Sequence, residues 1–154
     1  HDRRPILSIN VTSNPSAAWA ANQIVQAFPW ESAPRYLLRD RDGIYGKHFR
    51  SRVQNLGVKE GLTAARSPWQ NPYVERVIGT LRRELLDHVI VLNERHLRRL
   101  LRRYVSEYYH RCRTHLSLDK NSPEPRAVEP PEMGEVIELP LVGGLHHQYT
   151  RRAA

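Results

Sequence analysis

Several residue types that mark other classes of protein are scarce in this sequence. The only cysteine, Cys112, excludes an internal disulfide framework and a multi-cysteine zinc site. No run approaches the roughly 18 apolar residues of a membrane-spanning helix, and the first residues lack the apolar stretch of a signal peptide. Lysine occurs only at Lys47, Lys59 and Lys120. We therefore expect a protein of the reducing cytoplasm that does not enter a membrane.

Arginine supplies most of a strong positive charge. The 154 residues, a length that suits one domain, include 24 Lys and Arg against 16 Asp and Glu, which gives a net charge of +8. A basic chain favours a polyanionic partner, and the planar guanidinium binds two phosphate oxygens at once. The charge therefore indicates a nucleic acid, although a genome rich in arginine codons would produce the same excess without one.

The apolar pattern of the first 62 residues predicts alternating strands and helices. The predicted elements are, in order, a strand at 6–11, a helix at 17–27 capped by Ser16, a strand at 36–38, a helix at 49–56 and a strand at 58–62. The strand at 36–38 ends at the charged residues 39–42. This order is typical of an α/β fold, in which chemistry often lies at the carboxyl ends of the strands.

Two long helices and a tail are predicted to follow. Asn71 is a suitable N-cap and Pro72 a suitable first residue for the earlier helix, and the later one begins near Asn93. Beyond residue 118 the chain becomes rich in proline, which predicts a linker or an extended arm. One β-like run lies in the tail, at 136–139.

Two carboxylates stand where rigid elements end or begin. Asp40 directly follows the predicted strand at 36–38, and Glu75 lies in the first turn of the helix that starts at Pro72, with 34 residues between them. Carboxylates are the hard oxygen ligands that suit Mg²⁺ or Mn²⁺. Glu75 would also be favoured there by the helix dipole alone, so the pair by itself is weak evidence for a metal site.

Arginines occupy one face of each long helix. On the first helix Gly79 lies four residues and Arg82 seven residues after Glu75, and Arg83 is adjacent to Arg82. A glycine inside a helix indicates either a close approach of the DNA backbone or close packing of another helix. On the second helix the arginines recur at helical spacing opposite the apolar face, which favours contact with nucleic acid over a solvated surface: Arg95, Arg98, Arg99, Arg102 and Arg103.

Together these segments resemble a known family. The segment 38–46 (LRDRDGIYG) is similar to the one that holds the second catalytic aspartate in bacterial insertion-sequence transposases related to retroviral integrases. The segments 67–76 (SPWQNPYVER) and 79–85 (GTLRREL) resemble the helix of their third carboxylate. The segment 108–118 resembles the one after the second helix, where relatives often have Asn at the position of His110.

The resemblance implies an α/β fold of the ribonuclease H-like type and a DDE-type transposase or integrase that transfers DNA strands with two Mg²⁺ or Mn²⁺ ions. It assigns the second and third metal ligands to Asp40 and Glu75, with Asp42 as the alternative to Asp40. Residues 1–118 would form the catalytic core and residues 119–154 the linker and tail. The expected DNA contacts are Asn71, which we interpret first as a helix cap, and Arg76, Arg82, Arg83, Arg98, Arg99 and Arg102.

The sequence departs from the family at the first catalytic aspartate. Only Asp2 and Glu31 precede Asp40, and neither matches an aspartate in the middle of a strand. We therefore expect a partial core that lacks the first two strands and is inactive alone, whereas the intact relative would be a nucleoid-associated homo-oligomer acting on transposon ends and target DNA. The alternatives are a DNA-binding remnant without catalysis and a metal nuclease of the same fold.

Overall fold

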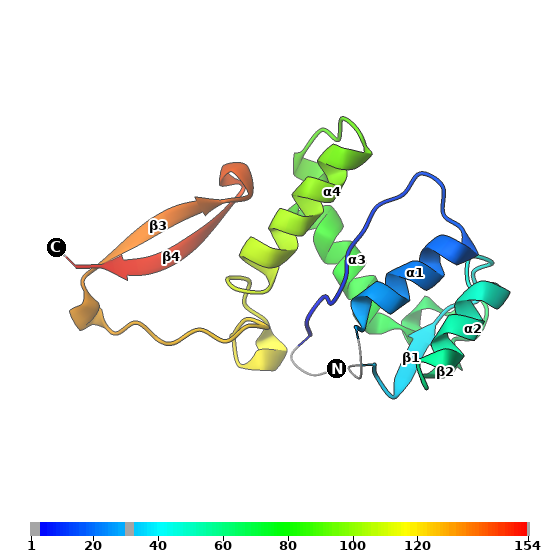
Figure 1. Cartoon of the computed structure of the whole chain (residues 1–154). Coiled ribbons are helices and arrows are strands. Elements are labelled where there is room, and N and C mark those ends of the chain that lie inside the picture. The colour runs from blue at the N-terminus through cyan, green and yellow to red at the C-terminus, as the bar shows by residue number, and fades with distance from the viewer. Residues whose placement is uncertain (1–3, 30–32, 154) are drawn as a thin grey trace. The chain divides into compact units, whose positions relative to one another are not determined.

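The structure, a computed structural model, describes residues 4–29 and 33–153. It divides into two compact units, one formed by Asn10–Arg83 and the other by His1–Ile9 together with Glu84–Ala154. Figure 1 shows the order of the helices and strands. Asp2 and Glu31 lie outside the described residues.

In its described residues the unit Asn10–Arg83 contains a small parallel sheet, three α-helices and a short 3₁₀ helix. Its elements are α1 (Ala17–Ala27), β1 (Tyr36–Arg39), α2 (Lys47–Asn55), β2 (Lys59–Leu62), the short 3₁₀ helix Pro68–Gln70 and α3 (Pro72–Glu84), whose last residue belongs to the other unit. The strands pair from Tyr36 with Lys59 to Arg39 with Leu62. The hydroxyl of Ser16 accepts a hydrogen bond from the amide of Trp19, so the predicted cap of α1 is confirmed.

The core of this unit joins α1 and α2 to one side of the sheet. Its buried residues are Ala20, Ala21, Phe49, Val53 and Val58, with Leu37 packed against them. Arg39 is also buried, and its Nε donates to Glu60 at 2.8 Å. The Arg39 guanidinium lies over the rings of Tyr45 and Phe49, so the charge is paired and its stem is packed. This packing fixes the end of β1.

The second unit consists of a long helix, turns and a hairpin. Its elements are the 3₁₀ helix Leu86–His88, α4 (Glu94–Arg103), a π-helix at Tyr104–Tyr109, the 3₁₀ helices Leu116–Leu118 and Pro131–Met133, β3 (Glu135–Leu141), the turn Val142–Gly144 and β4 (His146–Arg152). The side chains of Leu85 and Tyr104 are fully buried there. The oxygen of Asn93 accepts from the amide of His96, so the predicted start of α4 is confirmed.

Two expectations about strands were wrong or incomplete. Residues 6–11 form no strand, because no described strand pairs with them and the amide of Ile6 donates to Nε2 of His110 instead. The run at 136–139 is part of β3 as predicted, but its antiparallel partner β4 was not foreseen.

No helix in the described part of the chain combines the length and apolar character needed to cross a bilayer.

Candidate functional site

Asp40 lies in a turn built from two aspartates directly after β1. Oδ1 of Asp40 accepts from the amide of Asp42 at 3.1 Å, and Oδ1 of Asp42 accepts from the amide of Ile44 at 2.8 Å. Burial raises the pKa of the Tyr45 hydroxyl above its ordinary value, and the charges of Asp40 and Asp42 raise it further. Both carboxylates are exposed and lie close enough to Tyr45 to act on the same hydroxyl.

The main chain on both sides of Asp40 is held to the segment that follows β2. The Thr63 amide donates to the Arg39 carbonyl at 3.0 Å, and Nε of Arg41 donates to the Thr63 carbonyl at 3.0 Å. Nη1 of Arg39 donates to the carbonyl of Asp40 itself at 2.9 Å. Asp40 is therefore an exposed carboxylate on a fixed backbone, which is the arrangement that a metal ligand requires.

Glu75 lies in the first turn of α3, as predicted. Its amide donates to the carbonyl of Asn71 at 3.2 Å, which makes Pro72 the first helical residue. Upstream, the side chain of Gln70 accepts from the amide of Ala64 at 2.7 Å and holds the loop that leads into the helix. The Glu75 side chain is exposed.

Asp40 and Glu75 belong to the same compact unit, but no third ligand joins them in the described part of the chain. No group of three or more His, Cys, Asp or Glu residues has a metal-binding arrangement among those residues. The two carboxylates fit Mg²⁺ or Mn²⁺ by their chemistry, because magnesium often keeps waters and takes only one or two protein carboxylates. The metal site remains a prediction.

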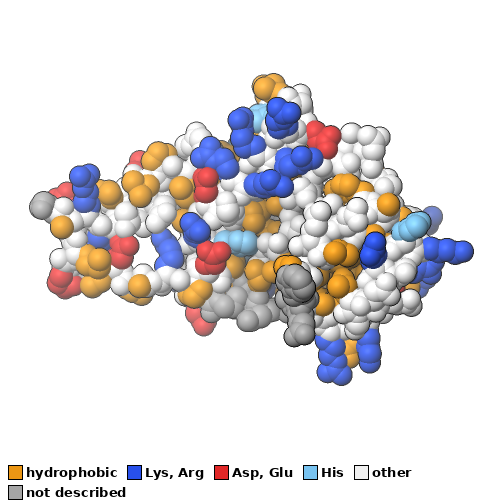
Figure 2. Space-filling view, in the orientation of Figure 1, with side chains coloured by type: hydrophobic (Ala, Val, Ile, Leu, Met, Phe, Trp, Pro, Cys, Tyr) orange, Lys and Arg blue, Asp and Glu red, His pale blue; other side chains and the backbone are white. Residues whose placement is uncertain are grey.

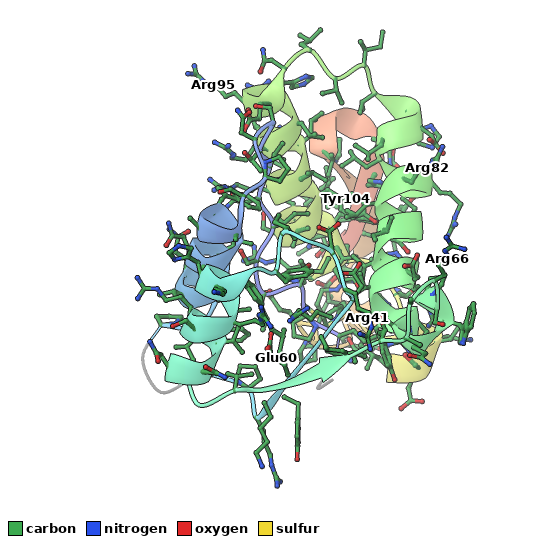
Figure 3. The ribbon with its side chains drawn as sticks, turned by 90° about the vertical axis from the view of Figure 1, so that its right-hand side faces the viewer. Arg41, Glu60, Arg66, Arg82, Arg95 and Tyr104 are labelled. Carbon is green, nitrogen blue, oxygen red and sulfur yellow. The ribbon has the colours of Figure 1, made fainter. Side chains whose placement is uncertain are left out.

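The arginines of α3 are exposed, and the guanidinium of one of them lies against Gly79. Arg76, Arg82 and Arg83 all lie on the surface, and Arg82 projects outward from the helix (Figure 3). A Cβ added to Gly79 would lie 3.0 Å from Nη1 of Arg83. The guanidinium of Arg83 therefore lies against Gly79, but the end of a flexible side chain can move aside, so this contact does not by itself require a glycine.

The arginines of α4 differ in how far neighbouring acids neutralise them. Arg98 is half-buried and bonded to Glu94 at 3.2 Å, and Arg103 is bonded to Glu107 at 2.9 Å. The remaining side chains are exposed, and Figure 2 shows Lys and Arg gathered over this helix. They are Arg95, which points outward in Figure 3, Arg99 and Arg102.

A network around Glu84 was not foreseen from the sequence. The carboxylate of Glu84 accepts from Arg113 and, at 2.7 Å, from the hydroxyl of Tyr104. The Glu84 carbonyl lies 2.7 Å from Nε2 of His146, whose ring stacks on that of Tyr108 at 3.9 Å. The only sequence signal was an acid in the last turn of a helix, where the dipole disfavours negative charge unless a cation compensates.

A comparison with known protein families finds a similarity in the central part of the chain. Residues 56–123 match the family described as the integrase core domain. This segment contains Glu75 and the arginines of α3 and α4, whereas Asp40 precedes it. An integrase core has a ribonuclease H-like fold, and the helices and small sheets do not conflict with that class. No curated protein matches the chain.

Proposed function

We propose, on the premise that residues 56–123 belong to the integrase core domain family, that this chain carries the second and third metal-binding carboxylates of a DDE-type DNA transposase or integrase. These are Asp40 and Glu75. The observation that carries the proposal is the position of Glu75, exposed in the first turn of α3 and inside the matched segment. Asp40, exposed on the fixed backbone after β1, supports it.

In this proposal two carboxylates bind the metal ions, and a separate set of residues binds the DNA. Two Mg²⁺ or Mn²⁺ ions, when bound, would activate the attacking oxygen and stabilise the leaving oxygen at a DNA phosphate. Asp40 and Glu75 would hold these ions on one side. Six arginines, all exposed except the half-buried Arg98, would bind the phosphodiester backbone and orient the DNA together with Asn71: Arg76, Arg82, Arg83, Arg98, Arg99 and Arg102.

We further infer that residues 1–118 form only part of the catalytic core and that the complete core has additional strands. Among the described residues β1 pairs only with β2, and Tyr36 and Leu38 on one side of it are 59% and 46% exposed. Residues 6–11 belong to no described strand. A strand that paired with the other edge of β1 could supply the third carboxylate. The chain alone would then be inactive, with residues 119–154 as its linker and tail.

Metal binding and DNA cleavage by the purified chain test this proposal. We expect weak Mn²⁺ binding that is lost in Asp40→Asn and in Glu75→Gln but is kept in Asp42→Asn, the matched control in the same turn. Adding a segment with the missing strands and aspartate should restore Mg²⁺-dependent strand transfer. Binding that survives both substitutions, or is lost only in Asp42→Asn, would overturn the assignment.

A DNA-binding protein without catalysis is the second candidate. The lack of a three-carboxylate cluster in the part of the chain that the structure describes favours it. This second candidate predicts that DNA binding does not depend on metal. It also predicts that adding the missing strands and aspartate does not produce strand transfer. Metal-dependent nicking by the chain alone, abolished by Glu75→Gln, would instead identify a nuclease.

A further inference from the structure

An exposed apolar tip precedes α4. Three consecutive side chains in the loop between the 3₁₀ helix Leu86–His88 and α4 face solvent, with exposed fractions of 84% for Ile90, 42% for Val91 and 75% for Leu92. Single exposed apolar residues are common on protein surfaces, but three in succession at a loop tip indicate a binding surface.

Hydrogen bonds fix this tip at both ends. The Leu92 amide donates to Nδ1 of His96 at 3.3 Å, and the His96 amide donates to Oδ1 of Asn93 at 2.9 Å. On the other side the His88 amide donates to the carbonyl of Leu85, a fully buried residue. The loop therefore presents its apolar side chains from a defined backbone, which lowers the entropic cost of inserting them into a partner.

Arginines continue from the tip along α4. Arg95, Arg99 and Arg102 are exposed at helical spacing, and Figure 2 shows basic side chains next to hydrophobic ones at this end of the helix. From Arg95 to Arg102 the helix rises roughly 10 Å, which corresponds to about three base steps of duplex DNA. Glu94, the acid closest to the tip on α4, is bonded to Arg98.

We propose that the tip Ile90–Leu92 is a wedge that enters duplex DNA between two base pairs while Arg95, Arg99 and Arg102 bind the flanking phosphates. Proteins that kink DNA insert Ile or Leu side chains in this way and thereby unstack one step. The charge decides the occupant, because a row of exposed arginines beside the tip attracts a polyanion more strongly than a neutral protein surface. This inference rests on the proposed DNA function and adds how the DNA is held.

The test uses the whole chain and a duplex with 2-aminopurine at successive positions and a dye pair at its ends. Binding should raise the 2-aminopurine fluorescence at one step and shorten the end-to-end distance. Ile90→Ser combined with Leu92→Ser should abolish both signals and weaken binding by about tenfold without changing the salt dependence, since no phosphate contact is lost. Arg99→Ala should have the opposite effects: the salt dependence of DNA binding should fall, and the rise in 2-aminopurine fluorescence should remain.

Val128→Ser is the matched control, because Val128 is 91% exposed and lies outside the tip. The single variant Ile90→Ser, with an intact thermal transition, guards against loss of fold in the double variant. If the double variant bound DNA with the same fluorescence change and the same bend as the wild type, the wedge proposal would be overturned. The proposed DNA function would stand. A change in oligomeric state without a change in DNA binding, or tighter binding to anionic vesicles than to the duplex, would also overturn the wedge proposal. A wild-type chain that binds no DNA would overturn the proposed function as well.

Discussion

Arg113 donates three hydrogen bonds to the carboxylate of Glu84, at 3.0, 2.9 and 2.7 Å, across 29 residues of sequence. The pair is about three-quarters buried, with side-chain exposures of 23% and 28%. It ties the end of α3 to the turn that follows the π-helix. The hydroxyl of Tyr104 completes the set of donors on the carboxylate.

Removing the cation of this pair should destabilise the protein. Arg113→Met leaves a partly buried carboxylate without its charged donor, and we expect a loss of about 2–3 kcal/mol in the free energy of unfolding. Tyr104→Phe removes one bond and should cost about 1 kcal/mol. Arg103→Met, which breaks the exposed pair with Glu107, is the control and should change the free energy of unfolding far less, because solvent screens an exposed ion pair. Urea unfolding measures all three, and equal losses for Arg113 and Arg103 would contradict the structural role.

The same pair predicts a loss of stability in acid. Burial alone would raise the pKa of Glu84, but the hydrogen bonds from Arg113 and Tyr104 outweigh it and hold the pKa below the ordinary 4.5. A lowered carboxyl pKa means that the stabilisation is complete above pH 4.5 and disappears as the pH falls through the folded value. Melting temperatures between pH 6 and pH 3 should therefore fall less in Glu84→Gln than in the wild type. Parallel curves would exclude this linkage.

His110 should release the N-terminal segment at mildly acidic pH. Burial lowers its pKa below the ordinary 6.5, Glu124 opposes this and Arg111 adds to it. The neutral ring accepts from the amide of Ile6 at 2.9 Å through Nε2, and protonation of Nε2 removes the acceptor. The contact is thus present above pH 6.5 and is lost as the pH falls through the folded pKa.

Amide NMR and hydrogen exchange of Ile6 measure this release. Protection, corrected for the intrinsic rate, should decline below pH 6.5 in the wild type. Protection should be low at every pH in His110→Ala and unchanged in His48→Ala, the control, because His48 is exposed on the surface of α2. Protection that stays constant in the wild type across the whole acid range would contradict the expected acceptor role.

Gly79→Ala separates the explanations for that glycine. The added methyl meets only the end of the flexible Arg83 side chain, so we expect a gain of about 1 kcal/mol in stability from helix propensity and unchanged DNA affinity. Arg83→Ala should lower the salt dependence of DNA binding, because one phosphate contact is lost. A fall in affinity in Gly79→Ala, with no effect of Arg83→Ala, would instead favour a close approach of the DNA backbone.

The sequence predicted those elements whose signals are local. Ser16 and Asn93 mark helix starts by their side chains, and Pro72 marks one by its fixed φ. Gly57 closes α2 with φ of +71°, a conformation that favours glycine. The positions of Asp40 and Glu75, at a strand end and in a first helical turn, followed from these boundaries, whereas their metal-binding role stays a prediction.

The features that the sequence did not predict depend on distant partners. A β-rich run at 6–11 becomes a strand only if a neighbour supplies the ladder, and no described strand does so. β4 (HHQYTRR) lacks apolar alternation and is a strand because β3 pairs with it along its full length. The pairing of Glu84 with Arg113 needs the turn after the π-helix, which no local pattern specifies.

The π-helix at Tyr104–Tyr109 has a consequence for protein engineering. A π turn accommodates an extra residue relative to an α turn, and the amide of His110 accordingly reaches the carbonyl of Val105. Deleting one residue here would let α4 continue as a regular helix, and the residues that follow would keep nearly their present angular position, because the wide turn already absorbs the extra residue. Chimaeras that exchange α4 between related chains should therefore be joined before Tyr104, so that the wide turn and its extra residue stay together.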